Sequence, residues 1–191
     1  MVYIINNNIP KQKTAVQETT SLPSSTLSPF PTQTANLTPS PTSSQTMQDT
    51  ETNSNTAIIK TEKGDIELMF YPKDAPNTVA NFVQKAKSGF YNNLIFHRVE
   101  DWVIQGGDPL GNGTGGGNMS VEFNTQPFVV GSLGVASRGD GVTQNDAQFF
   151  ITKKDSLFLN GKYTNFGIVT KGMDVVEKIE IGDKILEINL Q

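Results

Sequence analysis

The chain has 191 residues, a net charge of −4, no cysteine and a single histidine. Its length suits one ordinary domain with an appendage. The acidic balance excludes the basic surface that nucleic acid requires, and the lack of cysteine excludes disulfides, a thiolate nucleophile and zinc fingers. One histidine is too few for the usual multi-histidine metal sites, and no run approaches the ~18 apolar residues of a membrane span. We therefore predict no metal, no cofactor, no nucleic-acid partner and no membrane span in this chain.

Composition changes sharply near residue 56. Between residues 19 and 48 serine, threonine and proline dominate, and no residue is charged. Such a stretch buries too little apolar surface to offset the entropy that ordering it would cost. We therefore predict that residues 1–56 form a disordered spacer with a bias towards polyproline conformation, and that residues 57–191 form the folded domain.

A spacer of this composition is typical of stalks that separate an exposed domain from its anchor. This suggests an extracytoplasmic protein whose anchor precedes Met1, a hypothesis that rests on composition alone. The alternative is a cytoplasmic protein with a disordered N-terminal segment. The sequence leaves both open.

The folded part begins with a predicted hairpin. The stretch "AIIKTEKGDIELMFY" alternates on both sides of Lys63-Gly64, which is typical of two antiparallel strands joined by a tight turn. We expect Ile58, Ile66 and Leu68 to point inward.

A helix is predicted next, in "DAPNTVANFVQKAKSGF". Pro76 lies near its start and Gly89 ends it. The apolar residues between them follow the three- and four-residue spacing of one helix face: Val79, Phe82, Val83 and Ala86.

Several short apolar runs follow, bounded by glycine or polar turns: "LIFHRV", "WVIQ", "FVVGSLGVAS", "AQFFIT" and "TNFGIV". A second short helix is predicted at "GMDVVEKI" and a last strand at "KILEINL". Many short strands with few helices favour a closed sheet, because closure removes exposed strand edges.

The glycine run "GNGTGGG" raises the question of phosphate binding. Gly111, Gly113 and Gly116 satisfy G-x-G-x-x-G, but a dinucleotide site also needs a helix to begin there, and the residues that follow have no helical period. No G-K-[ST] follows, which excludes a P-loop. We predict that these glycines provide positive φ angles and close backbone approach in an irregular loop.

Two other features have simple structural interpretations. His97 could act as a general base, but no serine lies in a nucleophile-elbow setting, so a packed, hydrogen-bonded structural histidine is the favoured interpretation. The tripeptide Arg138-Gly139-Asp140 resembles an integrin-binding motif, yet in "SRGDGVTQND" it is most simply a turn.

Taken together, "FHRV" to "IQGGDP", the glycine run, "GSLGVAS", "NDAQFFIT" and "LFLNGKYTNFG" resemble the cyclophilins, which are peptidyl-prolyl cis-trans isomerases. The resemblance covers residues 57–190, with five blocks in the family's order. It implies a mostly β fold: a closed eight-stranded antiparallel barrel capped by two helices, with the substrate groove on its outer face.

The resemblance also implies a set of site residues. The family's catalytic arginine falls at Arg98, and Gln105 resembles the glutamine that holds its guanidinium and touches substrate. Gly113 resembles a loop glycine of the groove, and Ala136 matches the family's alanine. The remaining implied groove residues are the glutamine and phenylalanine of "AQFFIT", Gln148 and Phe150, with Leu159 near the proline pocket.

The chain departs from the family at several of these positions. Trp102 and Val103 stand where cyclophilins carry Phe-Met, and one residue is missing between Arg98 and Gln105. Trp102 enlarges one wall of the groove. The other implied groove residues that depart from the pattern are Ser137 for asparagine, Phe158 for tryptophan and Tyr163 for histidine.

Adjacent phenylalanines in "AQFFIT" must face opposite sides of a strand, so we expect Phe149 in the core and Phe150 in the groove.

The resemblance implies an isomerase that acts on proline-containing peptides and unfolded proteins without a covalent step, and that helps proteins to fold. The alternative is a non-catalytic peptide-binding module whose shortened Arg98 to Gln105 segment has altered the geometry. Nothing in the sequence indicates more than a monomer.

Overall fold

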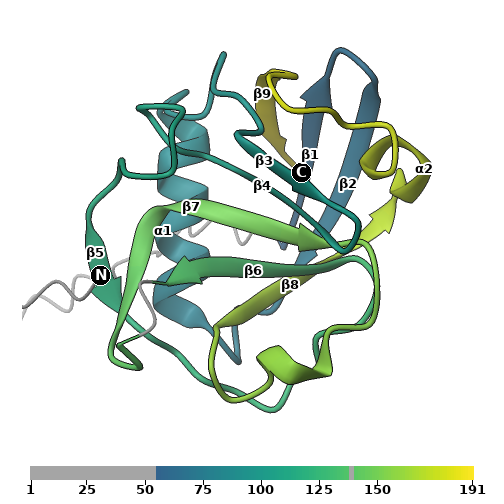
Figure 1. Ribbon diagram of the computed structural model, residues 1–191. Coiled ribbons are helices and arrows are strands. Elements are labelled where there is room, and N and C mark those ends of the chain that lie inside the picture. The colour runs from purple at the N-terminus through teal and green to yellow at the C-terminus, as the bar shows by residue number, and fades with distance from the viewer. Residues whose placement is uncertain (1–54, 138–139) are drawn as a thin grey trace, which may run out of the picture. The chain divides into compact units, whose positions relative to one another are not determined.

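The computed structural model describes residues 55–137 and 140–191. These residues form a curled antiparallel sheet with two α-helices. Strands β1, β2 and β9 lie at a large angle to β6 and β7 (Figure 1). The predicted spacer lies outside the described residues as far as residue 54. Arg138 and Gly139 of the Arg-Gly-Asp tripeptide also lie outside them.

The first hairpin forms as predicted from β1 (Thr56–Thr61) and β2 (Gly64–Phe70). Its register pairs Ile59 with Ile66, and both side chains are fully buried. Ile58 is only partly buried, so its predicted inward orientation is wrong. Directly paired residues share a face of the sheet, so pairing Ile59 with the core residue Ile66 turns Ile58 outward.

The remaining strands fall in or beside the predicted apolar runs, with one addition. They are β3 (Arg98–Glu100), β4 (Val103–Gly106), β6 (Ser132–Ser137), β7 (Thr143–Thr152), β8 (Asn165–Lys171) and β9 (Ile185–Leu190). A short strand that the sequence pattern did not predict, β5 (Asn118–Ser120), pairs with β7. The strand order is β3-β4-β7-β6-β8-β2-β1-β9.

The sheet differs from the expected closed eight-stranded barrel. It has nine strands, and within the described residues its ladder ends at β3 and β9, which are linked only by a bridge between Ile95 and Lys184 and the hydrogen bonds beside it. Asn93 and Gly182, just outside this bridge, both have positive φ angles. Extended pairing therefore stops there, and the sheet is an open, curled half-barrel.

The helices are α1 (Pro76–Lys87) and the single-turn α2 (Met173–Val176), and a 3₁₀ turn, η1, spans Leu157–Leu159. No helix within residues 55–137 and 140–191 has the length and apolar character to cross a membrane. Helix α1 packs against β7 and β9 and inserts Phe82 into the core. Its ring lies 5.0–5.5 Å from four other aromatic rings, those of Phe70, Tyr91, Phe149 and Phe166.

The N-terminus of α1 is capped from outside the helix. Ala75, at the N-cap position, has no side-chain group that could bind the free N–H groups. Glu122 does this instead: its carboxylate accepts hydrogen bonds from the backbone N–H and side chains of Asn77 and Thr78, at 2.7–3.0 Å. Burial alone would raise the pKa of Glu122, but these hydrogen bonds lower it.

We predict that Glu122→Gln lowers the free energy of unfolding by about 1–2 kcal/mol near neutral pH, the usual effect of losing a helix cap. The folded-state pKa of Glu122 is lowered, so its contribution is present above its unfolded value of 4.5 and is lost as pH falls through the folded pKa. Urea unfolding at several pH values measures this. The difference in the free energy of unfolding between the wild type and the variant should become smaller below pH 4.5.

The control is Glu62→Gln, which changes an exposed glutamate in the first hairpin turn. This variant should unfold like the wild type at every pH. A Glu122→Gln defect of the same size in acid as at neutral pH would contradict the capping role of the carboxylate.

Candidate active site

Strand pairing brings four site positions into one row. Arg98 of β3 pairs with Gln105 of β4, Gln105 pairs with Phe150 of β7, and Phe150 pairs with Gly134 of β6. Directly paired residues of antiparallel strands point to the same side of the sheet. The three side chains therefore emerge on one face, although they come from distant parts of the chain.

A series of hydrogen bonds crosses this row. Arg98 Nη1 donates to Gln105 Oε1 at 3.2 Å, and Gln105 Nε2 donates to Gln148 Oε1 at 2.9 Å. Gln148 Nε2 then donates to the carbonyl oxygens of Gly113 and Gly115, at 3.1 and 2.8 Å. This amide relay connects the arginine to the glycine-rich loop.

A second set of contacts surrounds the other edge of the guanidinium. Arg98 Nε donates to Glu100 Oε1 at 2.7 Å, and Trp102 Nε1 donates to Glu100 Oε2 at 2.9 Å. Arg98 Cζ also lies 5.4 Å from the centre of the Trp102 ring, and Trp102 meets Phe158 edge to face. The hydrogen bond from Arg98 lowers the pKa of Glu100. Sequence analysis did not identify Glu100.

Two adjacent hollows open on this face. The first, the aromatic hollow, has a volume of about 240 Å³, and the second, the polar hollow, about 320 Å³. The aromatic hollow is lined by Arg98, Trp102, Val103, Gln105, Ala136, Ser137, Phe150, Phe158, Leu159 and Tyr163. The polar hollow is lined by Gln105, Gly113, Thr114, Ala136, Ser137, Asn145 and Gln148.

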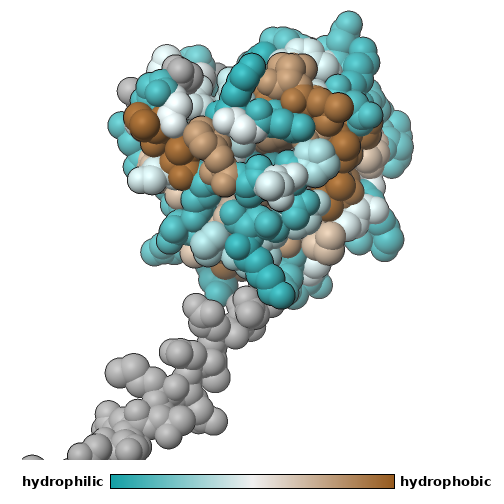
Figure 2. Space-filling view, turned by 90° about the horizontal axis from the view of Figure 1, so that it is seen from below, coloured by the Kyte–Doolittle hydropathy of each residue, from teal (hydrophilic) through white to brown (hydrophobic). Residues whose placement is uncertain are grey.

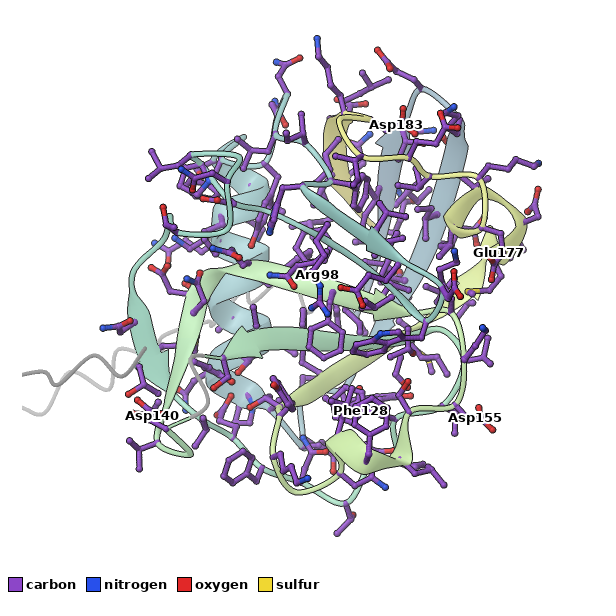
Figure 3. All side chains as sticks on the ribbon, in the orientation of Figure 1. Arg98, Phe128, Asp140, Asp155, Glu177 and Asp183 are labelled. Carbon is purple, nitrogen blue, oxygen red and sulfur yellow. The ribbon has the colours of Figure 1, made fainter. Side chains whose placement is uncertain are left out.

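Every residue predicted for the site therefore lines at least one hollow, and Gln105, Ala136 and Ser137 line both. Arg98 lies over the middle of the sheet (Figure 3), and its side chain is 42% exposed. The guanidinium is thus at the surface and beside the hollow that Phe150 borders.

An aromatic cluster forms the floor of the aromatic hollow. Phe150 is 5% exposed, stacks on Phe128 at 5.7 Å between ring centres, and meets the edge of Tyr163 at 5.8 Å. Phe149 belongs to the main core, which is the predicted division between the two phenylalanines. Phe158 lies at the rim instead and is 59% exposed. Apolar surface also gathers in separate patches on the face shown in Figure 2.

Gly134 and Phe128 also build this floor, and the sequence patterns did not identify either as part of the site. A Cβ atom at Gly134 would overlap the Phe150 ring. The absence of a side chain there lets the ring lie flat across β6. Phe128 is fully buried beneath the hollow. Both contacts join residues far apart in the sequence, so no local signal marks them.

The glycine-rich loop is held by Asp108. Its buried carboxylate accepts the backbone N–H groups of Leu110, Asn112 and Gly113. Gly111, Gly113 and Gly116 all have positive φ angles, between 66° and 87°. No helix begins after them, because the next element is β5. The prediction of an irregular loop without a phosphate-binding helix is confirmed.

His97 lies beneath this loop and lines neither hollow. Burial lowers its pKa. Gln148 lies near enough to oppose this shift, but within the described residues neither ring nitrogen makes a hydrogen bond of normal geometry. The histidine is packed as expected, but its predicted hydrogen bonding is wrong, because Gln148 directs its amide group to the loop carbonyls.

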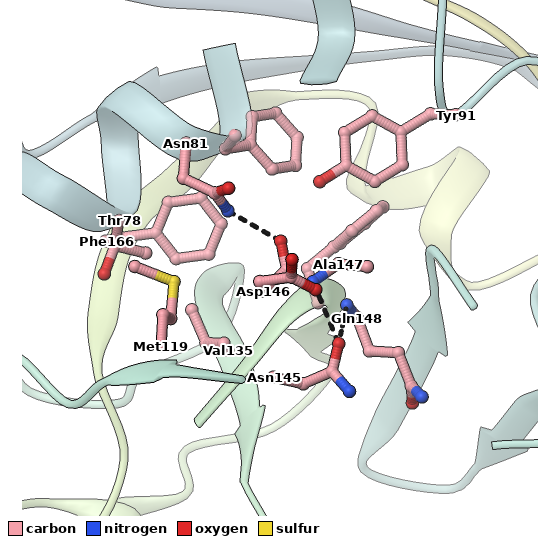
Figure 4. Close-up of a pocket in the computed structure, with 12 residues that line it drawn as sticks. Thr78, Asn81, Tyr91, Met119, Val135, Asn145, Asp146, Ala147, Gln148 and Phe166 are labelled. Atoms are coloured by element: carbon pink, nitrogen blue, oxygen red, sulfur yellow. Dashed lines mark hydrogen bonds between the residues drawn. The ribbon is translucent and has the colours of Figure 1, made fainter. Parts of the chain in front are cut away.

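Asn145, which lines the polar hollow, also holds the backbone around it (Figure 4). Its Oδ1 accepts the backbone N–H groups of Ala147 and Gln148, and its Nδ2 donates to the Gly115 carbonyl. Asn81 of α1 donates to the Asp146 carbonyl at 2.6 Å, which ties the helix to the same part of β7. A small gap lies between these residues, lined by Asn81, Asn145 and Gln148 among others. Its volume of about 10 Å³ holds at most one water molecule, so it is no ligand site.

Comparison with known proteins shows which family this chain resembles. Residues 56–188 match the family model of the cyclophilin type peptidyl-prolyl cis-trans isomerases. A peptidyl-prolyl cis-trans isomerase of Synechococcus elongatus is 42% identical over 139 residues, which covers 70% of this chain and 94% of the relative. The isomerase cypE of Dictyostelium discoideum is 43% identical over 130 residues, covering 65% of this chain and 83% of the relative.

Solved structures agree with the sequence matches. A crystal structure of a cyclophilin type isomerase of Cryptosporidium parvum has a TM-score of 0.68 and 29% identity, and covers 72% of this chain and 97% of that chain. A second crystal structure of it, in the presence of the dipeptide Ala-Pro, has a TM-score of 0.67 and 28% identity, and covers 71% and 98%. The chain therefore belongs to the cyclophilin-type peptidyl-prolyl cis-trans isomerases.

Proposed function

We propose that this chain accelerates rotation about X-Pro bonds in peptides and unfolded proteins, without a covalent step and with the assistance of Arg98, and that it thereby helps proteins to fold. The observation that carries the proposal is the position of Arg98 beside a hollow floored by Phe150. The related Cryptosporidium parvum isomerase was crystallised with a proline dipeptide, which supports the substrate class.

The chemistry requires a hydrogen-bond donor rather than a nucleophile. Amide resonance gives peptide rotation a barrier of ~18–20 kcal/mol, and the twisted transition state loses this resonance. The proline nitrogen then becomes an acceptor, so a donor aimed at it binds the transition state more tightly than the planar ground state. A guanidinium stays protonated and offers five N–H groups in one plane.

Arg98 has donors left for this role. Within the described residues, Nε is used by Glu100 and one N–H of Nη1 by Gln105. No other described residue accepts a hydrogen bond from the remaining N–H groups of its guanidinium. Because the two bonds hold the guanidinium at separate points, the free donors have a defined direction before a peptide arrives.

The two hollows suggest a division of the substrate. The aromatic hollow takes the proline ring, whose burial against Phe150, Leu159 and Val103 contributes a few kcal/mol at about 25 cal/mol per Å². The amides of Gln105 and Gln148 hold the flanking peptide. The other proposed substrate contacts are Trp102, Gly113, Ala136, Ser137, Phe158 and Tyr163.

The same proposal assigns the isomerase to residues 57–191 and treats residues 1–56 as a spacer. The family match, which begins at residue 56, supports this division.

We predict that Arg98→Ala lowers kcat/KM on the order of 100-fold, as removal of one transition-state donor does in other enzymes. The fold should be intact, because the side chain is partly exposed. A protease-coupled assay on an Ala-Pro peptide measures the rate. Arg98→Lys keeps the charge but loses the planar donor array, so its rate should lie between those of the wild type and Arg98→Ala.

The control is Lys171→Ala, which removes an exposed cation on β8, outside both hollows. An unchanged rate in Arg98→Ala would remove Arg98 from the mechanism. A wild-type protein that binds proline peptides without turnover would instead indicate a peptide-binding module.

We predict that Gly134→Ala lowers kcat/KM about tenfold, because an added Cβ forces the Phe150 ring into the aromatic hollow. The same assay tests this, with circular dichroism to verify folding. Val135→Ala, at the next position of β6, removes a core side chain and does not touch the hollow. Val135→Ala should be less stable than the wild type but keep the wild-type rate. Equal rates for Gly134→Ala and the wild type would contradict the prediction that the Phe150 ring blocks the hollow.

A further inference from the structure

The connection between β3 and β4 is a turn of only two residues. Only Asp101 and Trp102 lie between the strands, and Glu100 pairs directly with Val103. Glu100 lies two positions after Arg98 on the same strand, so both side chains emerge on one face. The short turn also brings Trp102 back beside this pair.

Both carboxylate oxygens of Glu100 are used, and by different partners. Oε1 accepts from Arg98 Nε at 2.7 Å and Oε2 accepts from Trp102 Nε1 at 2.9 Å. Trp102 in turn lies 5.4 Å from the Arg98 guanidinium carbon and contacts Phe158 across the rim. One carboxylate thus joins the proposed catalytic cation to the aromatic wall of the hollow.

The backbone that carries Glu100 is itself fixed. Lys153, which follows β7, donates its backbone N–H to the Trp102 carbonyl at 2.7 Å, and its Nζ reaches the Glu100 carbonyl at 3.4 Å. Lys153 Nζ also pairs with Glu177 at 3.3 Å. The turn is therefore attached to β7, the strand that carries Phe150.

We propose that Glu100 is a positioning residue, whose carboxylate holds the Arg98 guanidinium and the Trp102 indole in one arrangement at the wall of the aromatic hollow. This inference rests on the proposed function of Arg98. Gln105 fixes the guanidinium at Nη1 and Glu100 fixes it at Nε, and two attachment points define the orientation of a planar group. The arginine is then oriented before substrate binds.

A competing effect predicts the opposite sign. If Glu100 acted only through its charge, it would weaken the pull of Arg98 on the proline nitrogen, and its removal would raise the rate. The Arg98 and Glu100 side chains are 42% and 46% exposed, so solvent screens this effect. Orientation therefore dominates, and removal of Glu100 lowers the rate.

The test uses Glu100→Gln and Glu100→Ala, with Asp101→Asn as the matched control. Asp101 is the next residue in the turn, is exposed, and makes no hydrogen bond or ion pair with the rest of the described chain. We expect both Glu100 variants to lower kcat threefold to tenfold with KM within about twofold of wild type. Asp101→Asn keeps both constants.

Trp102 supplies an independent readout, because it is the only tryptophan in the sequence. Glu100→Ala removes both acceptor oxygens and frees the indole, so acrylamide should quench its fluorescence more strongly in this variant. Glu100→Gln keeps one acceptor oxygen, so its quenching should lie between those of Glu100→Ala and the wild type. Quenching in Asp101→Asn should match the wild type. A purely structural role for Glu100 elsewhere in the fold would leave the Trp102 signal unchanged.

A double-mutant cycle tests whether Glu100 acts through Arg98. In the Arg98→Ala background, adding Glu100→Ala should cause no further loss of rate, because the group to be oriented is gone. A loss that multiplies that of Arg98→Ala overturns the proposal, as does an unchanged or raised kcat in both single Glu100 variants.

The failure of the proposed function gives a different pattern. If Arg98→Ala matches the wild type, Arg98 is not the catalytic group, and the positioning role falls with it. If Arg98→Ala is impaired while both Glu100 variants keep wild-type rates and wild-type quenching, only the inference about Glu100 is overturned.

Discussion

The hydrogen bond between Gln105 and Gln148 joins the two halves of the site. Its direction follows from the ends of the relay: Arg98 can only donate, and the carbonyl groups of Gly113 and Gly115 can only accept. Gln105 must therefore turn its oxygen to Arg98 and its NH₂ to Gln148, which turns its own NH₂ to the loop. Each amide has one orientation that satisfies both neighbours. The cation and the glycine-rich loop are thus coupled through groups that have no alternative arrangement.

Strand β7 connects this hydrogen-bond relay to the aromatic hollow and to the core. Gln148 and Phe150 are two positions apart and line the polar and aromatic hollows, while Phe149 between them packs into the core against Phe82. A single strand therefore fixes both hollows relative to the hydrophobic core. Two neighbouring elements also support β7: Gly134 of β6 leaves space for the Phe150 ring, and Asn81 of α1 bonds the Asp146 carbonyl two positions before Gln148.

Local patterns predicted what depends on local periodicity, and the family resemblance supplied the rest of the site. The first hairpin, α1 and the opposite placement of Phe149 and Phe150 follow from alternation and helical spacing. Alternation could not choose between Ile58 and Ile59, because adjacent isoleucines fit either phase until β2 fixes the register. The cap from Glu122 to α1 and the space at Gly134 join residues far apart in the sequence. The open ladder depends on positive φ angles at Asn93 and Gly182, which the strand pattern does not reveal.

The lining of the two hollows indicates how the rate of such a site is set. Among the described residues that line them, Arg98 is the only side chain charged at neutral pH, and neither a carboxylate nor the histidine is included. Bond rotation transfers no proton, so it needs no group with a pKa near neutrality. A guanidinium keeps its charge throughout the physiological range, which leaves orientation as the quantity that the surrounding residues can vary. Gln105 contacts the guanidinium at Nη1 and Glu100 contacts it at Nε, so the proposed role of both residues is to set the orientation of Arg98.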